Sequence, residues 1–206
     1  MSGLADHILS TIHLEQFDEI AVRYVTEGSP ISSTEHREKY LDLKRWIEIN
    51  VERVQRIGLD TGPRRRVLDL GCGCGYFLYA CRLLGHEILG VDRPEKQSLY
   101  TEIREFLGVP NVSHVIKPFE PLPDLGGGRF DAVTAHMVCF NGHCTSSVWG
   151  PTEWRYLLDN LDELGARLVY LDLNSEPGGR AFTPELRDFF EDRGAGIQGH
   201  RVRIER

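Results

Sequence analysis

Two hydrophobic patterns alternate along most of this chain. Short runs of consecutive apolar residues indicate strands that are buried on both faces of a sheet. Between these runs, apolar residues recur three and four positions apart, which indicates amphipathic helices. The runs predict strands at residues 66–70, 87–92, 112–116, 130–135 and 167–173. The spaced patterns predict helices at 76–84, 95–107 and 184–193, and a further helix that begins at Pro151 or Thr152 and runs to Leu164. Strands that alternate with helices in this order predict an α/β fold with a doubly wound, mostly parallel sheet.

The two ends of the chain depart from this alternation. Residues 1–62 precede the first strand and predict an N-terminal helical segment that packs on a core formed by residues 63–206, within a single domain. Ser32-Ser33-Thr34-Glu35 has the form of a capping box, and it predicts a long helix that runs from there to about Ile57. At the other end, residues 200–205 predict one strand, with room for only a poor strand before it.

A glycine-rich turn, Asp69-Leu70-Gly71-Cys72-Gly73-Cys74-Gly75, joins the first predicted strand to the next helix. Glycine permits positive φ and has no Cβ to block a ligand that lies against the backbone. The free N–H groups of the following helix would then point at that ligand. Dinucleotide-binding turns have the spacing G-x-G-x-x-G/A, and here Tyr76 stands where their third small residue is expected. This spacing disfavours a nicotinamide-dependent oxidoreductase. The other alternative to a ligand-binding turn is a tight connection between strand and helix that binds no ligand.

The turn, with its acidic residue two positions before the first glycine, resembles the first motif of the class I S-adenosylmethionine-dependent methyltransferases. Gly90-Val91-Asp92-Arg93 is similar to the acidic end of strand two in that family, and residues 128–133 are similar to its entry into strand four. The resemblance covers residues 64–175. It implies a Rossmann-like sheet and S-adenosylmethionine as the cofactor. A non-catalytic protein that binds this cofactor on the same fold remains an alternative.

The resemblance also implies which residues bind the cofactor. Asp92 would accept both ribose hydroxyls, although an Asp before Pro94 also suits a helix N-cap. Asp69 would orient the methionine amino group. The loop after strand three departs from the family pattern, so Phe119 is expected beside the adenine and Glu120 is the local candidate for its amino group. The expected cofactor-binding residues are Asp69, Gly71, Cys72, Gly73, Gly75, Asp92, Arg93, Phe119, Glu120 and Ala135.

The stretch that follows strand four is predicted to be a long loop, residues 136–151, and to hold the methyl acceptor. His136 and His143 are the candidate catalytic bases, the alternative being loop histidines that bond to the backbone. Together with Cys139 and Cys144 they do not match the usual spacings of zinc ligands, so no metal is expected. The stretch lacks the Asp/Asn-Pro-Pro-Tyr/Phe motif of enzymes that methylate planar amino groups. A small-molecule hydroxyl, carboxyl or amine acceptor is therefore predicted.

Composition narrows the partners and the location. The 206 residues carry a formal net charge of −7, with one basic cluster at residues 64–66, which argues against a nucleic-acid substrate. No apolar stretch approaches the length of a membrane span, and no membrane partner is expected. Five cysteines in loose array predict a reducing, cytoplasmic location rather than a disulfide framework. A monomer or a homodimer is expected.

Overall fold

The computed structural model describes residues 2–26, 37–94, 98–138, 148–173 and 182–206. The chain groups into two compact units. The helical unit comprises Met1–Arg64, Cys72–Ile88 and Glu95–Pro110, and the sheet unit comprises Arg65–Gly71, Leu89–Pro94 and Asn111–Arg206. The predicted boundary between a helical segment, residues 1–62, and a core, residues 63–206, stays a prediction.

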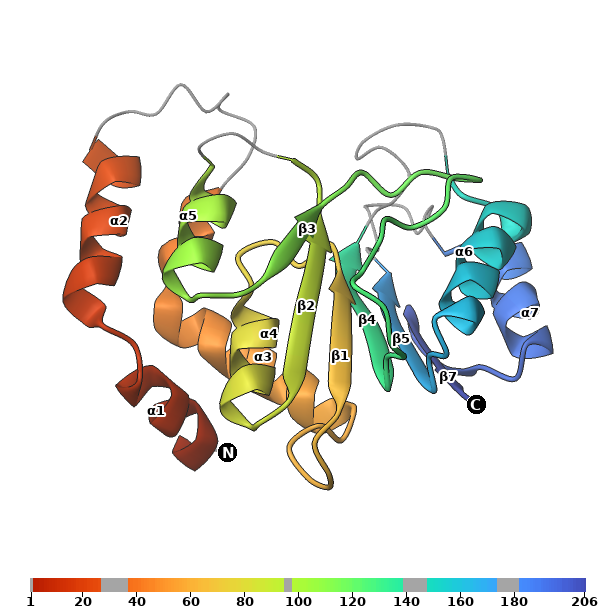
Figure 1. Cartoon of the computed structure of the whole chain (residues 1–206), viewed down its shortest axis with the longest axis horizontal. Coiled ribbons are helices and arrows are strands. Elements are labelled where there is room, and N and C mark those ends of the chain that lie inside the picture. Colours follow the sequence, from red (N-terminus) through yellow and green to blue (C-terminus); the bar gives the residue numbers. More distant parts are fainter. Residues whose placement is uncertain (1, 27–36, 95–97, 139–147, 174–181) are drawn as a thin grey trace. The chain divides into compact units, whose positions relative to one another are not determined.

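A seven-stranded sheet of order β3-β2-β1-β4-β5-β7-β6 confirms the predicted fold class. The described pairs β1–β4, β2–β3 and β4–β5 are parallel, whereas β7 runs antiparallel to β5 and β6. The strand order runs outward from the middle in both directions, and β1 and β4 lie side by side where it reverses (Figure 1). The strands are β1 Arg66–Leu70, β2 Glu87–Asp92, β3 Asn111–Ser113, β4 Ala132–Val138, β5 Leu168–Leu173, β6 Gly196–Gln198 and β7 Arg201–Glu205.

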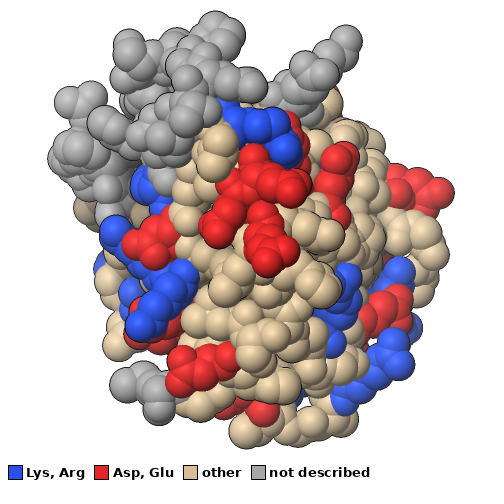
Figure 2. All heavy atoms as spheres, turned by 90° about the vertical axis from the view of Figure 1, so that its left-hand side faces the viewer, with Lys and Arg blue, Asp and Glu red and all other residues tan. Residues whose placement is uncertain are grey.

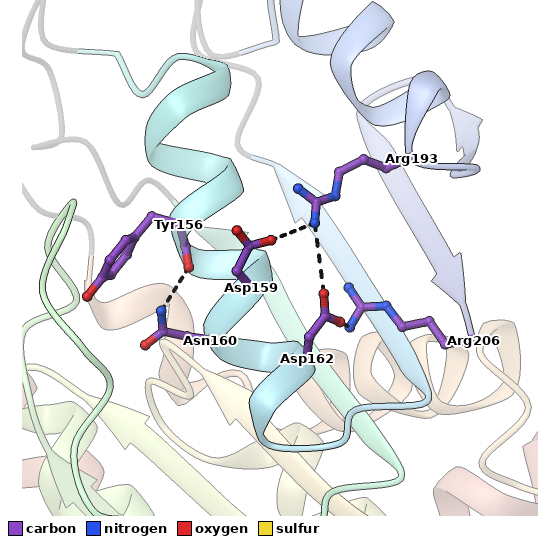
Figure 3. A network of polar contacts seen from close by, with 6 residues as sticks. All are labelled: Tyr156, Asp159, Asn160, Asp162, Arg193 and Arg206. Atoms are coloured by element: carbon purple, nitrogen blue, oxygen red, sulfur yellow. Dashed lines mark hydrogen bonds and ion pairs between the residues drawn. The ribbon is translucent and has the colours of Figure 1, made fainter.

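One face of the sheet is apolar and packs against α6 (Pro151–Glu163) and α7 (Pro184–Asp192). Trp154 of α6 lies edge-on to Phe190 of α7, with ring centroids 5.6 Å apart, and both side chains are buried. Polar contacts tie the same helices together at the surface (Figure 3). Arg193 lies 2.7 Å from Asp159 and 3.8 Å from Asp162, and Asp162 also pairs with Arg206 near the end of the chain.

Strand β4 is longer than predicted. The prediction that a loop begins at His136 is wrong, because pairing with β5 continues through His136 and Val138. Met137, between them, has a φ of 55° and forms an irregularity in the register. Such a bulge inserts one residue and changes which face the following side chain joins. Val138 consequently pairs with Leu173 and packs against the apolar core, whereas His136 is on the opposite face of the sheet.

The helical unit is built from amphipathic helices that pack on one another. Helix α3 packs against α1 and α4, and α2 packs against α5. Ile8 of α1, Ile47 of α3 and Leu78 of α4 are fully buried. The elements are α1 Ser2–Ser10, α2 Leu14–Thr26, the 3₁₀ helix η1 Arg37–Leu41, α3 Leu43–Arg56, α4 Tyr76–Leu83 and α5 Leu99–Phe106.

Helix α3 begins later than the sequence predicts. The capping box at residues 32–35 lies outside the described residues, and η1 precedes α3. The side chain of Asp42 accepts a hydrogen bond from the backbone N–H of Arg45, so Asp42 is the N-cap. None of the helices in the described ranges combines the length and the apolar composition needed to cross a membrane.

Candidate functional site

Asp69 occupies the point in the sheet unit where the strand order reverses. Its side chain lies next to Thr134 of β4, the residue with which it pairs in the register. The Thr134 hydroxyl donates a hydrogen bond of 2.6 Å to Asp69 Oδ1, and both side chains are buried. In open α/β sheets, ligands bind at the carboxyl ends of the strands on either side of such a reversal. Asp69 is therefore a fixed carboxylate beside the edge where a ligand is expected.

Gly71 follows β1 directly and must be glycine for two reasons. Its φ is 76°, a region that side-chain-bearing residues rarely adopt. A Cβ at this position would also lie 2.9 Å from Val138 Cγ1. The Gly71 N–H donates to the Val91 carbonyl at 2.7 Å, which links the end of β1 to β2. Gly71 is thus held by both neighbouring strands.

The turn continues through the helical unit with two more glycines in the left-handed region. Gly73 has a φ of 54° and Gly75 a φ of 79°, and Gly75 caps the start of α4. A Cβ on Gly75 would lie 3.2 Å from Val109, whereas a Cβ on Gly73 would meet nothing within 4 Å. Arg104, a buried residue of α5, donates from Nη1 to the Gly73 carbonyl at 2.8 Å. The Gly73 carbonyl is therefore held by Arg104, whereas the space that a Cβ would occupy is open.

Residues next to the turn are buried. Cys72 and Cys74 occupy its variable positions, and both are buried. Tyr76, the first residue of α4, donates from its hydroxyl to the Tyr40 carbonyl at 2.8 Å. Burial raises the pKa of the Tyr76 hydroxyl well above its usual range, so this group stays a protonated donor. These contacts fix the start of α4, whose first N–H groups follow the glycines.

Asp92 ends β2 in the sheet unit and is half-buried. Its Oδ1 accepts a hydrogen bond of 2.8 Å from the backbone N–H of Arg93, and its carbonyl accepts one from the N–H of His114 after β3. The Arg93 side chain is exposed. A carboxylate that ends a parallel strand in this way can accept the two hydroxyls of a ribose, and that role for Asp92 stays a prediction.

Phe119 and Glu120 follow β3 on a turn at the surface of the sheet unit. Phe119 is 53% exposed, has a φ of 62°, and lies edge-on to Tyr156 of α6 at 5.9 Å. Glu120 is exposed and pairs with Lys117 at 3.3 Å. The predicted adenine-binding roles of both residues remain predictions.

Ala135 and His136 lie near the carboxyl end of β4, and both are buried. The His136 ring lies 5.8 Å from the ring of Tyr170 on β5, measured between centroids. His143, the second predicted base, lies outside the described residues, as do Cys139 and Cys144. In the described part of the chain, no three His, Cys, Asp or Glu side chains lie close enough together to hold a metal ion.

The sequence analysis missed several residues that fix this site. Thr134 and Arg104 each anchor a predicted residue, but a single Thr or Arg within an apolar pattern carries no signal of its own. Asp172 of β5, by contrast, did carry a signal in the sequence. It stands in the run Leu171-Asp172-Leu173, which has the same form as Leu68-Asp69-Leu70, and a carboxylate within a doubly buried strand needs an explanation in both places.

Comparisons with known proteins agree with one another about the family. The profile of a family described as "Methyltransferase domain" matches residues 35–141. Two curated relatives, both called tRNA U34 carboxymethyltransferase and both from Pseudomonas fluorescens, are 39% and 35% identical over 83 and 82 residues. These matches cover 37% of this chain, which spans only 24% of the length of either relative.

A solved structure extends the likeness to most of the fold. Magnesium protoporphyrin IX methyltransferase from Synechocystis PCC 6803, solved with bound S-adenosylmethionine, is 15% identical to this chain, with a TM-score of 0.54. The likeness covers 93% of this chain and 97% of that one. At this level of identity the comparison concerns the fold alone.

Proposed function

Because this chain belongs to the methyltransferase-domain family of class I S-adenosylmethionine-dependent enzymes, we propose that it transfers the methyl group of that cofactor to a small-molecule acceptor. The carrying observation is the glycine turn, in which three glycines adopt positive φ directly after the buried Asp69. Two of them are required by packing against Val138 and Val109, whereas the Cβ position of Gly73 is open. This open stretch of backbone fits a nucleoside ligand that lies against it.

The proposed roles of the polar residues follow from the needs of the reaction. Bound S-adenosylmethionine supplies a methyl group that is attached to a positively charged sulfur. After transfer of the methyl group, this sulfur is part of a neutral thioether. The protein therefore has to align donor and acceptor and to exclude water. We assign Asp92 to the ribose hydroxyls and Asp69 to the methionine amino group. His136, a buried histidine at the end of β4, is the proposed base for an acceptor that loses a proton.

Charge supports a small acceptor over a nucleic acid. On the face drawn in Figure 2, the side on which α2 lies, acidic side chains form a group in the upper middle, and most of the basic side chains lie toward the edges of the view. Helix α2 itself exposes Glu15, Asp18 and Glu19. In the basic cluster, Arg66 donates to the carbonyls of Gly127 and Leu125, so its guanidinium is committed within the protein. The tRNA named for the curated relatives is the competing acceptor.

The cofactor assignment is tested by thermal unfolding with S-adenosylhomocysteine and, separately, with NADH. A ligand that binds only the folded state at about 100 times its Kd adds roughly 2.7 kcal/mol of stability. For a chain of this size that corresponds to a rise in Tm of about 5–11 °C. We expect this rise with S-adenosylhomocysteine and none with NADH. The reverse result would assign the turn to a dinucleotide.

Asp92→Asn tests the ribose contact, and Asp124→Asn is its matched control. Both carboxylates accept a hydrogen bond from a nearby backbone N–H, but Asp124 lies in the exposed loop before β4. Loss of charge-assisted hydrogen bonds costs about 1.5–3 kcal/mol, so Asp92→Asn should weaken S-adenosylhomocysteine binding about 10- to 100-fold in calorimetry. Equal affinities for the two variants would remove Asp92 from the site.

Acceptor class is tested by release of S-adenosylhomocysteine from S-adenosylmethionine. Small-molecule acceptors should produce turnover that His136→Ala reduces, and total tRNA should neither be methylated nor compete. Salt-sensitive binding of tRNA together with its methylation would favour the nucleic-acid acceptor instead. Binding of the cofactor product without turnover of any acceptor would indicate a non-catalytic binding protein.

A further inference from the structure

A row of polar side chains crosses three neighbouring strands of the sheet unit. His136 of β4 pairs in the register with Asp172 of β5, and Asp172 pairs with Arg201 of β7. Residues that pair across neighbouring strands point to the same face of a sheet. This is the face opposite the apolar core, because Leu171, Leu173 and Val202 belong to that core. The row lies entirely within the sheet unit.

Three polar atoms at this row have no hydrogen-bond partner in the described structure, although they are buried. They are Tyr170 Oη, Asp172 Oδ1 and Arg201 Nε. Tyr170 and Asp172 are each only 4% exposed. His200 Nε2 lies 3.1 Å from Asp172 Oδ1 and Arg201 Nε lies 3.9 Å from it, but neither makes a hydrogen bond with it. Buried polar atoms are almost always satisfied, and leaving one unsatisfied destabilises the fold.

We propose that Tyr170, Asp172 and Arg201 form a subsite for a neutral hydroxyl group of the methyl acceptor. This inference rests on the proposed methyltransferase function and names the substrate class. A hydroxyl both donates and accepts hydrogen bonds, so one such group between Asp172 Oδ1 and Arg201 Nε satisfies both atoms. Tyr170 lies two positions before Asp172 on β5 and on the same face, and its Oη is the proposed second contact.

The other two acceptor classes fit these atoms less well. A carboxylate has no proton to give to Asp172, so it would leave Asp172 Oδ1 unsatisfied. An ammonium group has only donors, and Arg201 already offsets the charge of Asp172. A neutral amine uses its single lone pair to attack the methyl carbon, so either form leaves Arg201 Nε unsatisfied, whereas a hydroxyl oxygen has a second lone pair. The arrangement therefore selects a neutral group that both donates and accepts hydrogen bonds.

The position of His136 completes the chemistry. Its ring lies 5.8 Å from the Tyr170 ring, on the same face as Asp172. As the bond between the acceptor oxygen and the methyl carbon forms, the bond between that carbon and sulfur breaks and its electron pair stays on sulfur. The hydroxyl proton turns from Asp172 Oδ1 to the imidazole of His136, so charge and atoms balance. Arg201 Nε keeps its hydrogen bond to the oxygen, and neither Asp172 nor Tyr170 takes a proton.

The first test uses the stability of the ligand-free protein. Tyr170→Phe removes a buried hydroxyl that bonds to nothing in the described structure, and we expect its Tm to rise by about 2–4 °C. Tyr79→Phe is the matched control, because that buried tyrosine shares a 2.8 Å hydrogen bond with Thr11. Its Tm should fall by a similar amount. An equal fall in both variants would show that the Tyr170 hydroxyl has a structural bond, and would overturn the subsite.

The second test uses three probes that share one ring: benzyl alcohol, benzylamine and benzoate. Thermal shifts are measured with saturating S-adenosylhomocysteine present. Benzyl alcohol should stabilise the wild type and the Tyr79→Phe variant, and it should lose this effect in Tyr170→Phe and Asp172→Asn. A larger shift with benzylamine or benzoate, no shift with benzyl alcohol, or a shift that persists in both subsite variants would each overturn the proposal.

The same thermal-shift measurements distinguish a failure of this inference from a failure of the proposed function on which it rests. S-adenosylhomocysteine alone should stabilise the wild type and all three variants. If it does so and benzyl alcohol does not, the hydroxyl subsite is wrong and the cofactor assignment stands. If S-adenosylhomocysteine fails to stabilise the wild type, the proposed function itself is wrong. Should Asp172→Asn fail to fold, Tyr170→Phe carries the test alone.

Discussion

Gly71→Ala is predicted to destabilise the protein through two separable effects. Forcing a residue with a Cβ into the left-handed region costs about 1–2 kcal/mol. The new Cβ would in addition lie 2.9 Å from Val138 Cγ1, and overpacking of this kind costs about 1–3 kcal/mol. A total of about 3 kcal/mol corresponds to a fall in Tm of about 6–12 °C for a chain of this size.

Gly73→Ala separates the two effects, because its φ is 54° and its Cβ would meet nothing within 4 Å. It should show the backbone cost alone, a fall of about 3–6 °C. The double variant Gly71→Ala/Val138→Ala should be more stable than the sum of its single changes predicts, since the contact atom is gone. Urea unfolding is measured for the wild type, for the single variants Gly71→Ala, Gly73→Ala and Val138→Ala, and for the double variant. Equal losses for Gly71→Ala and Gly73→Ala, with additive behaviour in the double variant, would refute the contact with Val138.

Three further predictions concern other contacts. Arg104→Leu leaves the Gly73 carbonyl without its 2.8 Å donor, so urea unfolding should show a loss of about 1–3 kcal/mol and calorimetry should show weaker S-adenosylhomocysteine binding; full retention of both would contradict this role of Arg104. Burial alone would raise the pKa of Glu102, but hydrogen bonds from Arg23 and Tyr24 outweigh it and lower that pKa below the ordinary value of 4.5. The wild type should therefore be more stable than Glu102→Gln at neutral pH, and unfolding at decreasing pH should show this advantage disappear below 4.5, as the pH falls through the lowered pKa. Asp162→Asn weakens the contacts to Arg193 and Arg206 in Figure 3, and its cost of up to about 1 kcal/mol should shrink in high salt, whereas a salt-independent cost would indicate packing.

The sequence predicted the bounds of β1 and β2 best. They agree with the predicted 66–70 and 87–92 because each strand is rich in branched apolar residues and stops at a clear signal, Gly71 in one case and the Asp92-Arg93 pair in the other. The end of β4 was missed for a physical reason. His136 looks like a loop residue in a sequence, yet it continues the alternation in which Thr134 and His136 share one face and Val133 and Ala135 share the other.

Helix starts were predicted less well because several caps compete. Ser32 and Asp42 both suit an N-cap, and the hydrogen bond from Arg45 to Asp42 settles the start of α3. Thr183 before Pro184 had no such competitor, and α7 begins there as predicted. Of the candidate site, the glycine turn and Asp92 carry local signals, and they led to the resemblance that the family match confirms. Contacts between distant residues, such as Thr134 with Asp69, have no local signal at all.

The strands at the two edges of the sheet bear on how copies of this chain can associate. β3 and β6 are each three residues long. A second copy that tried to extend the sheet at either edge would find only a few unpaired backbone groups, which is how natural sheets avoid edge-to-edge aggregation. Any dimer of this protein is therefore expected to form through side-chain surfaces, and the sheet should stay at its own width even at high protein concentration.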